Sequence, residues 1–442
     1  MKKKLLIGLS IILLLFFLGF LFIRPQLRIL AGYVAKNACS CAYVQGMAKE
    51  QIRTEDVGYG LLRFADFELN EEERSASSSV YGLVKRVAIY RGDLGCVLVP
   101  KAGLGDDKIN PTLDFPSSTI AGFPFEKTKG DSLHTTIDNL QIQNALSIGF
   151  EALGTRAIVV VKNGQIIAEQ YSEGFDENSL HLGWSMSKSI TNALIGILVK
   201  QGKLSLDQNN LLEEWKGTPK AAITLNDLLQ MNSGLLWEEA YGKACAATNM
   251  LFEEAAMGKY AAAQEREGIA GEKWYYSSGT SNILSEIIRR NFTSDKSYWN
   301  FPYRALFSKI NTPSFRLEAD ASGTYVGSSY SYATARDWAK FGLLFLNNGN
   351  QNGQQILPRD WVNHTRTIAP NSSGEYGAHF WLNRNQKFPA APDDLYYCGG
   401  FNGQYVFIIP SEDMVIVRLG IDGLGEMNAN QLLENVLKSI RE

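Results

Sequence analysis

A serine and a lysine three residues apart are the first pair in this sequence that could carry covalent chemistry. Ser185 and Lys188 lie within the segment His181-Leu-Gly-Trp-Ser-Met-Ser-Lys-Ser189. At the start of a helix, this spacing places the hydroxyl and the amine on one face, where an unprotonated amine can accept the hydroxyl proton during attack on a carbonyl. The helix N-terminus would also stabilise the developing negative charge. The pair predicts a serine nucleophile and a lysine base in a partly buried pocket that lowers the lysine pKa.

The S-x-x-K spacing occurs once in the chain, directly before an amphipathic segment. A helix-capping serine followed by a solvated lysine would leave the same short pattern. Further residues must therefore decide between a structural and a catalytic interpretation.

A second group of polar residues lies in the segment Gly271-Glu-Lys-Trp-Tyr-Tyr-Ser-Ser-Gly-Thr-Ser-Asn282, ahead of a helix expected from about Ile283. Tyr276 could share a proton with the lysine and pass it to a leaving group, with Ser278 as a hydrogen-bonding companion. For an isolated Y-x-S sequence, an aromatic core residue followed by a capping loop is the alternative.

Two hairpins and a helix are predicted to position these residues. Residues 155–171 alternate around Asn163-Gly164, a type I′ turn signal. The apolar residues between Ile190 and Leu198 recur at helical spacing. A second hairpin is expected from Tyr405–Ile409 and Met414–Leu419. Strands from both ends of the domain with helices between them predict a mixed α and β fold.

The amino terminus is predicted to be a membrane anchor spanning residues 1–24. Three lysines precede an apolar run of 19 residues, Leu5–Ile23, which is long enough to cross a bilayer core of about 30 Å as a helix. Arg24-Pro25-Gln26 follows, in place of the small residues of a signal-peptide cleavage site. We therefore expect an uncleaved single-pass anchor, with the rest of the chain outside the cytoplasm, either periplasmic or on the cell surface. A cleaved signal peptide is the alternative.

Between the anchor and the catalytic part, residues 25–130 are expected to form an N-terminal region with a small hairpin and a connector. The hairpin is predicted from Val80–Arg91 and Leu94–Val99 joined at Gly92-Asp93, and the connector from Lys101–Lys129. Residues 131–442 would then form the hydrolase domain.

Composition and cysteine spacing exclude several classes of function. The formal net charge is −3 and no basic stripe is present, which excludes nucleic-acid binding. The five cysteines match no zinc pattern, so neither a metal nor a cofactor is expected. In an exported chain, Cys96 could form a disulfide with either Cys39 or Cys41. Buried reduced thiols are the alternative.

Four ordered segments carry a resemblance to the beta-lactamase-related serine hydrolases. They are Ser185-Met-Ser-Lys188, Ile223-Thr-Leu-Asn-Asp-Leu-Leu-Gln-Met-Asn-Ser-Gly-Leu235, Tyr276-Ser-Ser278 and Gly400-Phe-Asn-Gly-Gln-Tyr405. This group includes class C beta-lactamases, D-alanyl-D-alanine carboxypeptidases, related esterases and 6-aminohexanoate-dimer hydrolase, which the chain resembles most in the final motif. The likeness covers about Thr155 to Leu419.

The resemblance implies an antiparallel sheet flanked by helices, a second, mainly helical lobe, and an acyl-serine pathway. It implies Ser185 as nucleophile, Lys188 as base, Tyr276 as proton relay and Ser278 as its hydrogen-bonding partner.

The resemblance also implies an oxyanion hole formed by the backbone N–H of Ser185 and one on a later strand, from either Cys398 or Phe401. Residues that follow the second motif, Trp237, Glu238 and Tyr241, are expected to line the pocket.

Two departures from the family pattern bear on the substrate. Ser278 stands where beta-lactamases have asparagine, and Tyr397-Cys-Gly-Gly400 stands where they have Lys-Thr-Gly. Loss of that lysine argues against recognition of a substrate carboxylate. We therefore expect hydrolysis of a small-molecule ester or amide. The alternatives are a D,D-carboxypeptidase or beta-lactamase, and a non-catalytic, membrane-tethered module that binds cell-wall fragments.

Overall fold

The central strands of the largest sheet are apolar and buried on both faces. The computed structural model describes residues 2–100, 103, 110–115 and 139–440. Its six-stranded antiparallel sheet has the order β12-β13-β14-β15-β5-β6. The strands are β5 (Thr155–Lys162), β6 (Gln165–Tyr171), β12 (Trp381–Leu382), β13 (Tyr396–Gly400), β14 (Gln404–Ile409) and β15 (Met414–Gly420).

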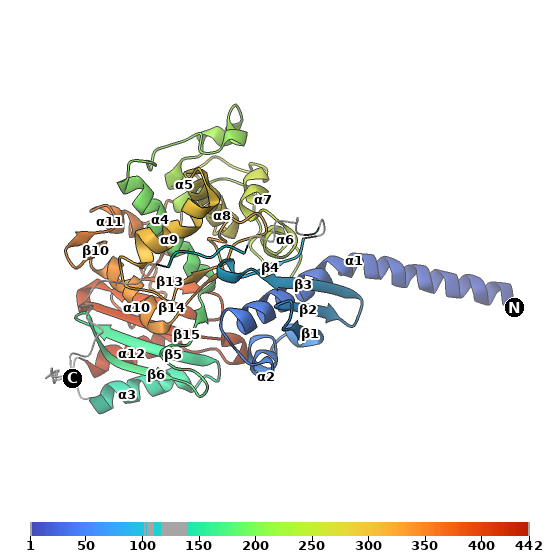
Figure 1. The fold of residues 1–442 in the computed structure, drawn as a ribbon, viewed down its shortest axis with the longest axis horizontal. Coiled ribbons are helices and arrows are strands. Elements are labelled where there is room, and N and C mark those ends of the chain that lie inside the picture. The colour runs from blue at the N-terminus through green and yellow to red at the C-terminus, as the bar shows by residue number, and fades with distance from the viewer. Residues whose placement is uncertain (1, 101–102, 104–109, 116–138, 441–442) are drawn as a thin grey trace.

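Helices cover both faces of this sheet (Figure 1). Along β5, Val159 and Val161 belong to the core shared with α10 (Ala335–Leu346), whereas Ile158 and Val160 belong to the core shared with α3 (Asn139–Ser147) and α12 (Ala429–Ser439). Since neighbouring side chains on a strand point to opposite faces, burial of both sets requires this layered arrangement.

Both hairpins predicted for the catalytic part are present. β5 and β6 are joined at Asn163 and Gly164, whose φ angles of 51° and 74° are those of a type I′ turn. β14 and β15 form the second hairpin, and β15 pairs with β5. The two ends of the domain thus meet in the middle of the sheet.

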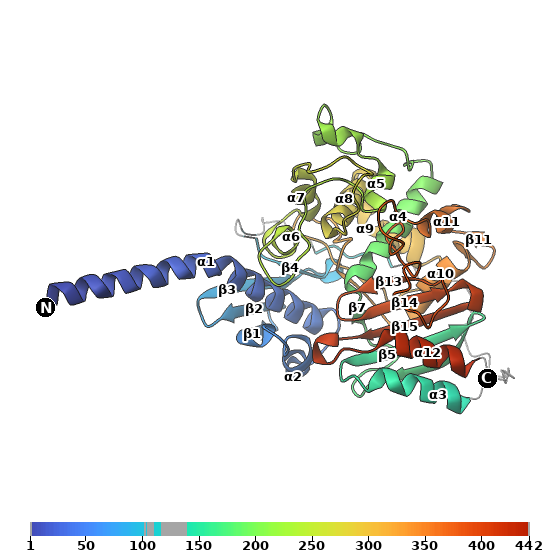
Figure 2. The same cartoon turned by 180° about the vertical axis from the view of Figure 1, so that it is seen from behind.

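The mainly helical lobe lies on the side of the six-stranded sheet where β13 is found, away from β6 (Figures 1 and 2). Its helices are α4 (Ser187–Lys200), α5 (Leu225–Leu229), α6 (Ala246–Glu253), α7 (Met257–Ala263), α8 (Ser278–Arg290) and α9 (Asp295–Pro302). The smaller remaining elements are α2 (Lys49–Gln51), α11 (Trp361–Thr365), β7 (His181–Leu182), β8 (Arg316–Leu317), β9 (Ser331–Ala333), β10 (Asn350–Gln351) and β11 (Gln354–Gln355). The predicted mixed fold with a helical lobe is confirmed.

Helix α8 begins five residues before the predicted start at Ile283. The Ser277 side chain accepts a hydrogen bond from the backbone N–H of Thr280 and caps the helix there. Ser278 therefore belongs to the first helical turn and not to a preceding loop. The polar residues of this turn are buried, which hid the helix from a search for apolar periodicity.

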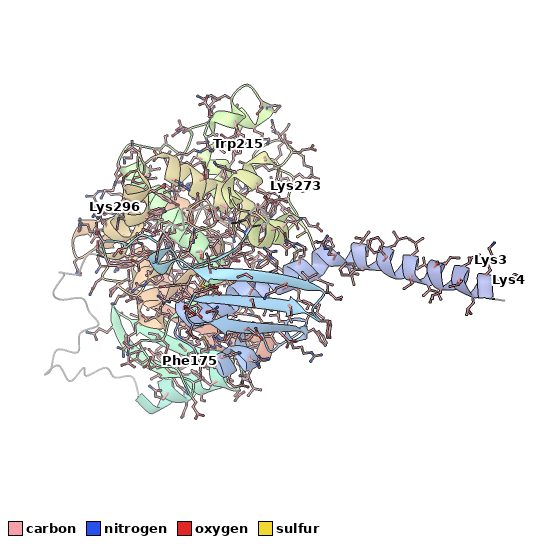
Figure 3. All side chains as sticks on the ribbon, turned by 45° about the vertical axis from the view of Figure 1, so that its right-hand side comes forward. Lys3, Lys4, Phe175, Trp215, Lys273 and Lys296 are labelled. Carbon is pink, nitrogen blue, oxygen red and sulfur yellow. A yellow bond between two sulfur atoms is a disulfide. The ribbon has the colours of Figure 1, made fainter. Side chains whose placement is uncertain are left out.

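A single helix of 42 residues, α1 (Lys2–Tyr43), connects the apolar N-terminus to the folded body. Its first half projects from the body with its side chains exposed, as Figure 3 shows. Its second half packs against a four-stranded antiparallel sheet and shares one core with the catalytic part. The strands are β1 (Ala65–Asn70), β2 (Ser75–Val80), β3 (Val84–Tyr90) and β4 (Cys96–Leu98).

The predicted N-terminal hairpin corresponds to β3 and β4, whereas β1 and β2 were not predicted. Most of the predicted connector lies outside the described residues. The division of the chain at residues 24 and 130 stays a prediction.

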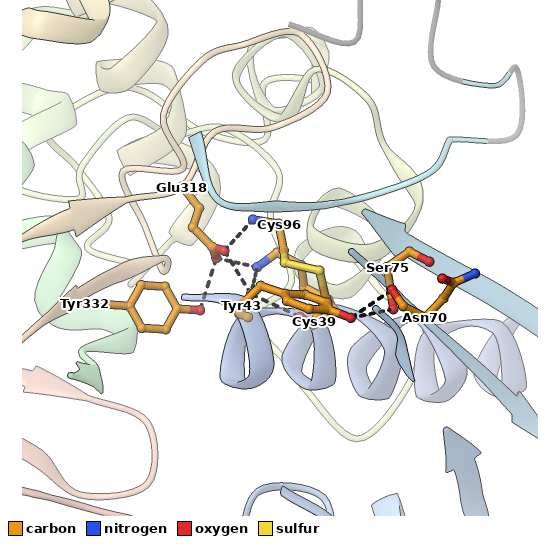
Figure 4. The surroundings of a disulfide bond; sticks show 9 residues. Cys39, Tyr43, Asn70, Ser75, Cys96, Glu318 and Tyr332 are labelled. Carbon is orange, nitrogen blue, oxygen red and sulfur yellow. Dashed lines mark hydrogen bonds and ion pairs between the residues drawn. A yellow bond between two sulfur atoms is a disulfide. The ribbon is translucent and has the colours of Figure 1, made fainter. Parts of the chain in front are cut away.

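The buried carboxylate of Glu318 fastens this N-terminal extension to the catalytic part, beside a disulfide that lies within the extension (Figure 4). The disulfide joins Cys39 on α1 to Cys96 on β4, one of the two pairings predicted, and Cys41 is a buried free thiol. The Glu318 carboxylate accepts hydrogen bonds from Lys36 Nζ and from three further donors: Ser40 Oγ at 2.8 Å, the Cys96 backbone N–H at 2.7 Å and Tyr332 OH at 3.0 Å.

Replacing Glu318 with alanine is expected to lower the free energy of unfolding by about 3–5 kcal/mol. The substitution leaves the Lys36 ammonium buried beside the Ser40 hydroxyl and the Tyr330 ring, without its carboxylate. Denaturant unfolding of the full chain in detergent, followed by tryptophan fluorescence, measures the change. Glu318→Gln keeps a hydrogen-bond acceptor, so its free energy of unfolding should fall by less. A loss below about 1 kcal/mol for the alanine variant would show that this cluster does not hold the extension in place.

Candidate active site

A strained turn presents Ser185 at the start of α4. Gly183 lies so close to Trp338 that an added Cβ would be 2.5 Å from the indole ring. Trp184, which follows, has φ 47°, a left-handed conformation that costs a non-glycine residue on the order of 1–3 kcal/mol. A 3₁₀ turn over Trp184–Met186 then leads into α4. The turn leaves Ser185 partly exposed at the helix N-terminus, where the sequence places the nucleophile.

Lys188 lies behind Ser185 and is almost fully buried. Its Nζ donates hydrogen bonds to Ser185 Oγ, Ser278 Oγ and the Ser328 carbonyl oxygen, each at 3.0 Å. Burial lowers the pKa of Lys188 to about 8, although the negative charge of Glu239 acts in the opposite direction. A substantial fraction of the amine is therefore unprotonated near neutral pH, as a base for the Ser185 hydroxyl requires.

Tyr276 packs against the same lysine. Its ring stacks on Trp381 with 5.1 Å between ring centres, and Lys188 Nζ lies 4.8 Å from the centre of the Tyr276 ring. Burial raises the pKa of Tyr276, the charge of Glu239 raises it further, and a hydrogen bond with Ser185 acts in the opposite direction. The phenol therefore stays protonated and can serve as a proton donor beside the serine.

The carboxylate of Glu239, a residue that was not predicted from the sequence, organises this part of the site. The Ser278 hydroxyl donates to Oε1 at 2.5 Å and the Ser278 backbone N–H donates to Oε2 at 2.9 Å. Trp237 Nε1 donates to the same carboxylate at 2.5 Å, and Tyr241 OH donates as well. Glu239 thereby fixes the serine that contacts Lys188 Nζ.

Side-chain alternation indicates only which residues of this segment share a face with Tyr241. In an extended segment, residues 237, 239 and 241 share one face and residue 238 points to the other. The expectation that Glu238 lines the pocket is wrong, because its side chain is exposed and pairs with Lys243. Trp237 contacts Glu239 and packs against Gly279, and it is not among the residues that line the cavity of Ser185.

The remaining predicted site residues divide into two groups. Tyr241 and Phe401 line the same cavity as Ser185, and their ring centres are 6.2 Å apart. The Cys398 side chain is buried in the core, and burial raises the pKa of its thiol to about 12. The Cys398 thiol therefore stays protonated. Strand β13 still passes directly beside the nucleophile turn, since an added Cβ at Gly400 would lie 2.2 Å from the Gly183 carbonyl oxygen.

The pH dependence of turnover is expected to follow Lys188. Because the free amine is the predicted base, kcat/KM should rise about tenfold per pH unit below about pH 8 and level off above it. Glu239→Gln removes a charge that raises the pKa of Lys188, so this rising limb of the pH profile should move to lower pH. Initial rates of ester hydrolysis across pH provide the measurement.

Glu238→Gln is the matched control, since it removes an exposed neighbouring charge and should leave the limb in place. A Glu239→Gln limb at the wild-type pH or above it would contradict this account of the lysine pKa.

The structure combines an antiparallel sheet, a helical lobe and a serine–lysine pair at the start of α4. The beta-lactamase family profile matches residues 151–422. The chain belongs to the beta-lactamase family, and the resemblance predicted from its motifs is confirmed.

Individual relatives are distant. The 6-aminohexanoate-dimer hydrolase of Paenarthrobacter ureafaciens is 22% identical over 320 residues, which cover 65% of this chain and 76% of that protein. A class C beta-lactamase structure has a TM-score of 0.53 at 16% identity and covers 69% of this chain and 100% of its own. A family VIII carboxylesterase structure has a TM-score of 0.53 at 14% identity, covering 68% and 97%. The two structures share the fold of this chain.

Proposed function

We propose that this protein is a membrane-anchored serine hydrolase that cleaves a small-molecule ester or amide through an acyl-Ser185 intermediate. The observation that carries the proposal is the placement of Lys188 Nζ, which is buried and 3.0 Å from both Ser185 Oγ and Ser278 Oγ. Hydrolase family membership supports the reaction class.

In this mechanism Lys188 accepts the Ser185 proton as Oγ forms a bond to the substrate carbonyl carbon. The bond from that carbon to the leaving oxygen or nitrogen then breaks, and the protonated phenol of Tyr276 supplies the proton to the leaving group. Water attacks the acyl-serine next and releases the acid. Ser278, held by Glu239, fixes the position of the lysine amine throughout.

For the oxyanion hole we propose the backbone N–H groups of Ser185 and Phe401. Of the two strand candidates, Phe401 lines the cavity that contains Ser185, whereas the Cys398 side chain belongs to the core. The position of the family's third-motif lysine is taken by residues such as Tyr397, which is buried against Phe388 and brings no cation to the cavity. This favours an ester or amide over a carboxylate-bearing beta-lactam or peptide.

Membrane attachment is proposed through the first half of α1. Its most apolar 18 residues have a mean hydropathy of 3.0 and none is buried in the structure. A single-pass anchor over residues 1–24 fits this segment, and a signal sequence passes the same test. The Cys39–Cys96 disulfide supports a catalytic part outside the cytoplasm, because disulfides persist in oxidising compartments.

Hydrolysis by the full chain in detergent, with p-nitrophenyl esters, the matching anilides and a chromogenic cephalosporin, tests the proposed function. We expect ester turnover that begins with a burst of about one p-nitrophenolate per chain, because acylation precedes hydrolysis of the acyl-enzyme. A folded sample without turnover of any substrate would favour the non-catalytic binding module.

A further inference from the structure

The cavity beside Ser185 is walled on one side by the N-terminal extension. It has a volume of about 520 Å³, within the range of about 300–1,000 Å³ that holds small-molecule ligands. The extension contributes the apolar side chains of Leu27, Leu30 and Phe64, and the catalytic part contributes Trp184 and Phe401. The nucleophile thus opens into a largely apolar chamber.

This chamber lies close to the point where α1 would leave a bilayer. Helix α1 is continuous through this region, and a helix rises 1.5 Å per residue. Leu27 and Leu30 are therefore about 6 and 10 Å along the axis from Ile23, the last residue of the apolar run. The polar layer of a bilayer extends about 5–8 Å beyond its hydrocarbon core. The outer end of the chamber would lie at the level of the lipid headgroups.

The extension also presents exposed apolar side chains on the same side. Tyr43 OH donates to the Asn70 carbonyl oxygen at 2.9 Å and so holds the β1–β2 turn near the end of α1 that is remote from the apolar run. The β2–β3 turn must then point the other way, as Figure 3 shows. Its residues Tyr81 and Leu83 are 70% and 56% exposed, and Leu61 beside the chamber is 67% exposed. Such side chains suit insertion among lipid headgroups and acyl chains.

We propose that the substrate is a long-chain acyl ester or amide that enters from the bilayer holding α1, with its acyl chain in this chamber. The inference rests on the proposed function, since it uses both the anchor and acyl transfer to Ser185. Oγ forms a bond to the lipid carbonyl carbon, the bond to the leaving alcohol or amine breaks, and the leaving group departs with a proton. Water then releases the fatty acid and restores the Ser185 hydroxyl.

A chain-length series tests the acyl site. The full chain in detergent is given p-nitrophenyl esters from acetyl to decanoyl, below their micelle-forming concentrations. Each added methylene should raise kcat/KM about two- to fourfold until the chamber is filled, so decanoyl should exceed butyryl by at least about 50-fold. Leu30→Trp narrows the chamber and should reduce that ratio about tenfold or more.

Leu153→Trp is the matched control, because Leu153 is 87% exposed and is not among the residues that line the chamber. If Leu30→Trp fails to fold, Leu27→Trp makes the same test at the outer end of the chamber. A flat chain-length profile, or an unchanged ratio in the folded variant, would overturn the lipid assignment and leave the serine hydrolase standing. Absence of turnover with every ester and every matching anilide would instead overturn the function on which the assignment rests.

Entry of the substrate from the membrane is tested by a separate experiment. The full chain is reconstituted in vesicles of phosphatidylethanolamine and phosphatidylglycerol, and a palmitoyl p-nitrophenyl ester is placed either in the same vesicles or in separate ones. Hydrolysis should be at least about tenfold faster in shared vesicles. Equal rates would show that the substrate arrives through water and would contradict entry from the bilayer.

Discussion

Replacing Ser185 with alanine is expected to reduce kcat/KM for every ester substrate by at least about 10⁴-fold. Without Oγ no acyl-enzyme can form, and the remaining groups can assist only a slow direct attack by water. The substitution removes one partly exposed oxygen, so the fold and the Lys188 contacts to Ser278 and Ser328 should persist. Steady-state hydrolysis of p-nitrophenyl esters, with circular dichroism as a check of folding, measures the loss.

Ser189→Ala provides the control for this loss. Ser189 lies on the same helix, but its hydroxyl donates to the His379 carbonyl oxygen at 2.8 Å and does not reach the site. Its loss should cost about 1 kcal/mol of stability and change kcat/KM less than threefold. A Ser185→Ala protein that retains more than about 1% of wild-type activity would show that another residue carries the reaction.

Replacing Lys188 with methionine is expected to lower kcat/KM by about 10²–10⁴-fold, the usual contribution of a positioned general base. Methionine fills a similar volume without a proton acceptor, and removal of a buried cation need not destabilise the fold. The pH–rate profile is the decisive readout, because the limb near pH 8 belongs to the lysine amine and should disappear.

Lys188→Arg separates charge from basicity. Arginine keeps the positive charge but does not lose its proton in this pH range, so it should be as inactive as methionine. Activity restored by arginine would show that Lys188 acts as a cation and not as a base. A Lys188→Met profile that keeps its limb near pH 8 would assign that limb to another group.

The main elements of the site could be predicted because their signals are local in sequence. The spacing of Ser185 and Lys188 places both on one helical face, and Asn163-Gly164 defines a turn with few alternatives. Glu239 could not be found in this way. Its role depends on a contact with Ser278, 39 residues later in the chain, and only the fold brings the two together.

The disulfide pairing could not be predicted from the sequence either, because it also depends on the fold. Cys39 and Cys41 are two residues apart on one helix and therefore lie about 200° apart around its axis. Their types and their distance from Cys96 are nearly identical, so the sequence left both pairings open. The packing of α1 on β4 determines which cysteine pairs with Cys96, because it turns Cys39 toward that strand. Strands β1 and β2 were missed because serines occupy most of β2 and weaken its alternation.

Labelling with a fluorophosphonate probe reports directly whether Ser185 is the nucleophile. The full chain in detergent is incubated with the probe, and its mass is measured before and after digestion. We expect one adduct per chain, located on Ser185, formed faster as the pH rises toward 8 and absent from Ser185→Ala. A folded chain that takes no label, or takes it on another residue, would contradict Ser185 as the nucleophile.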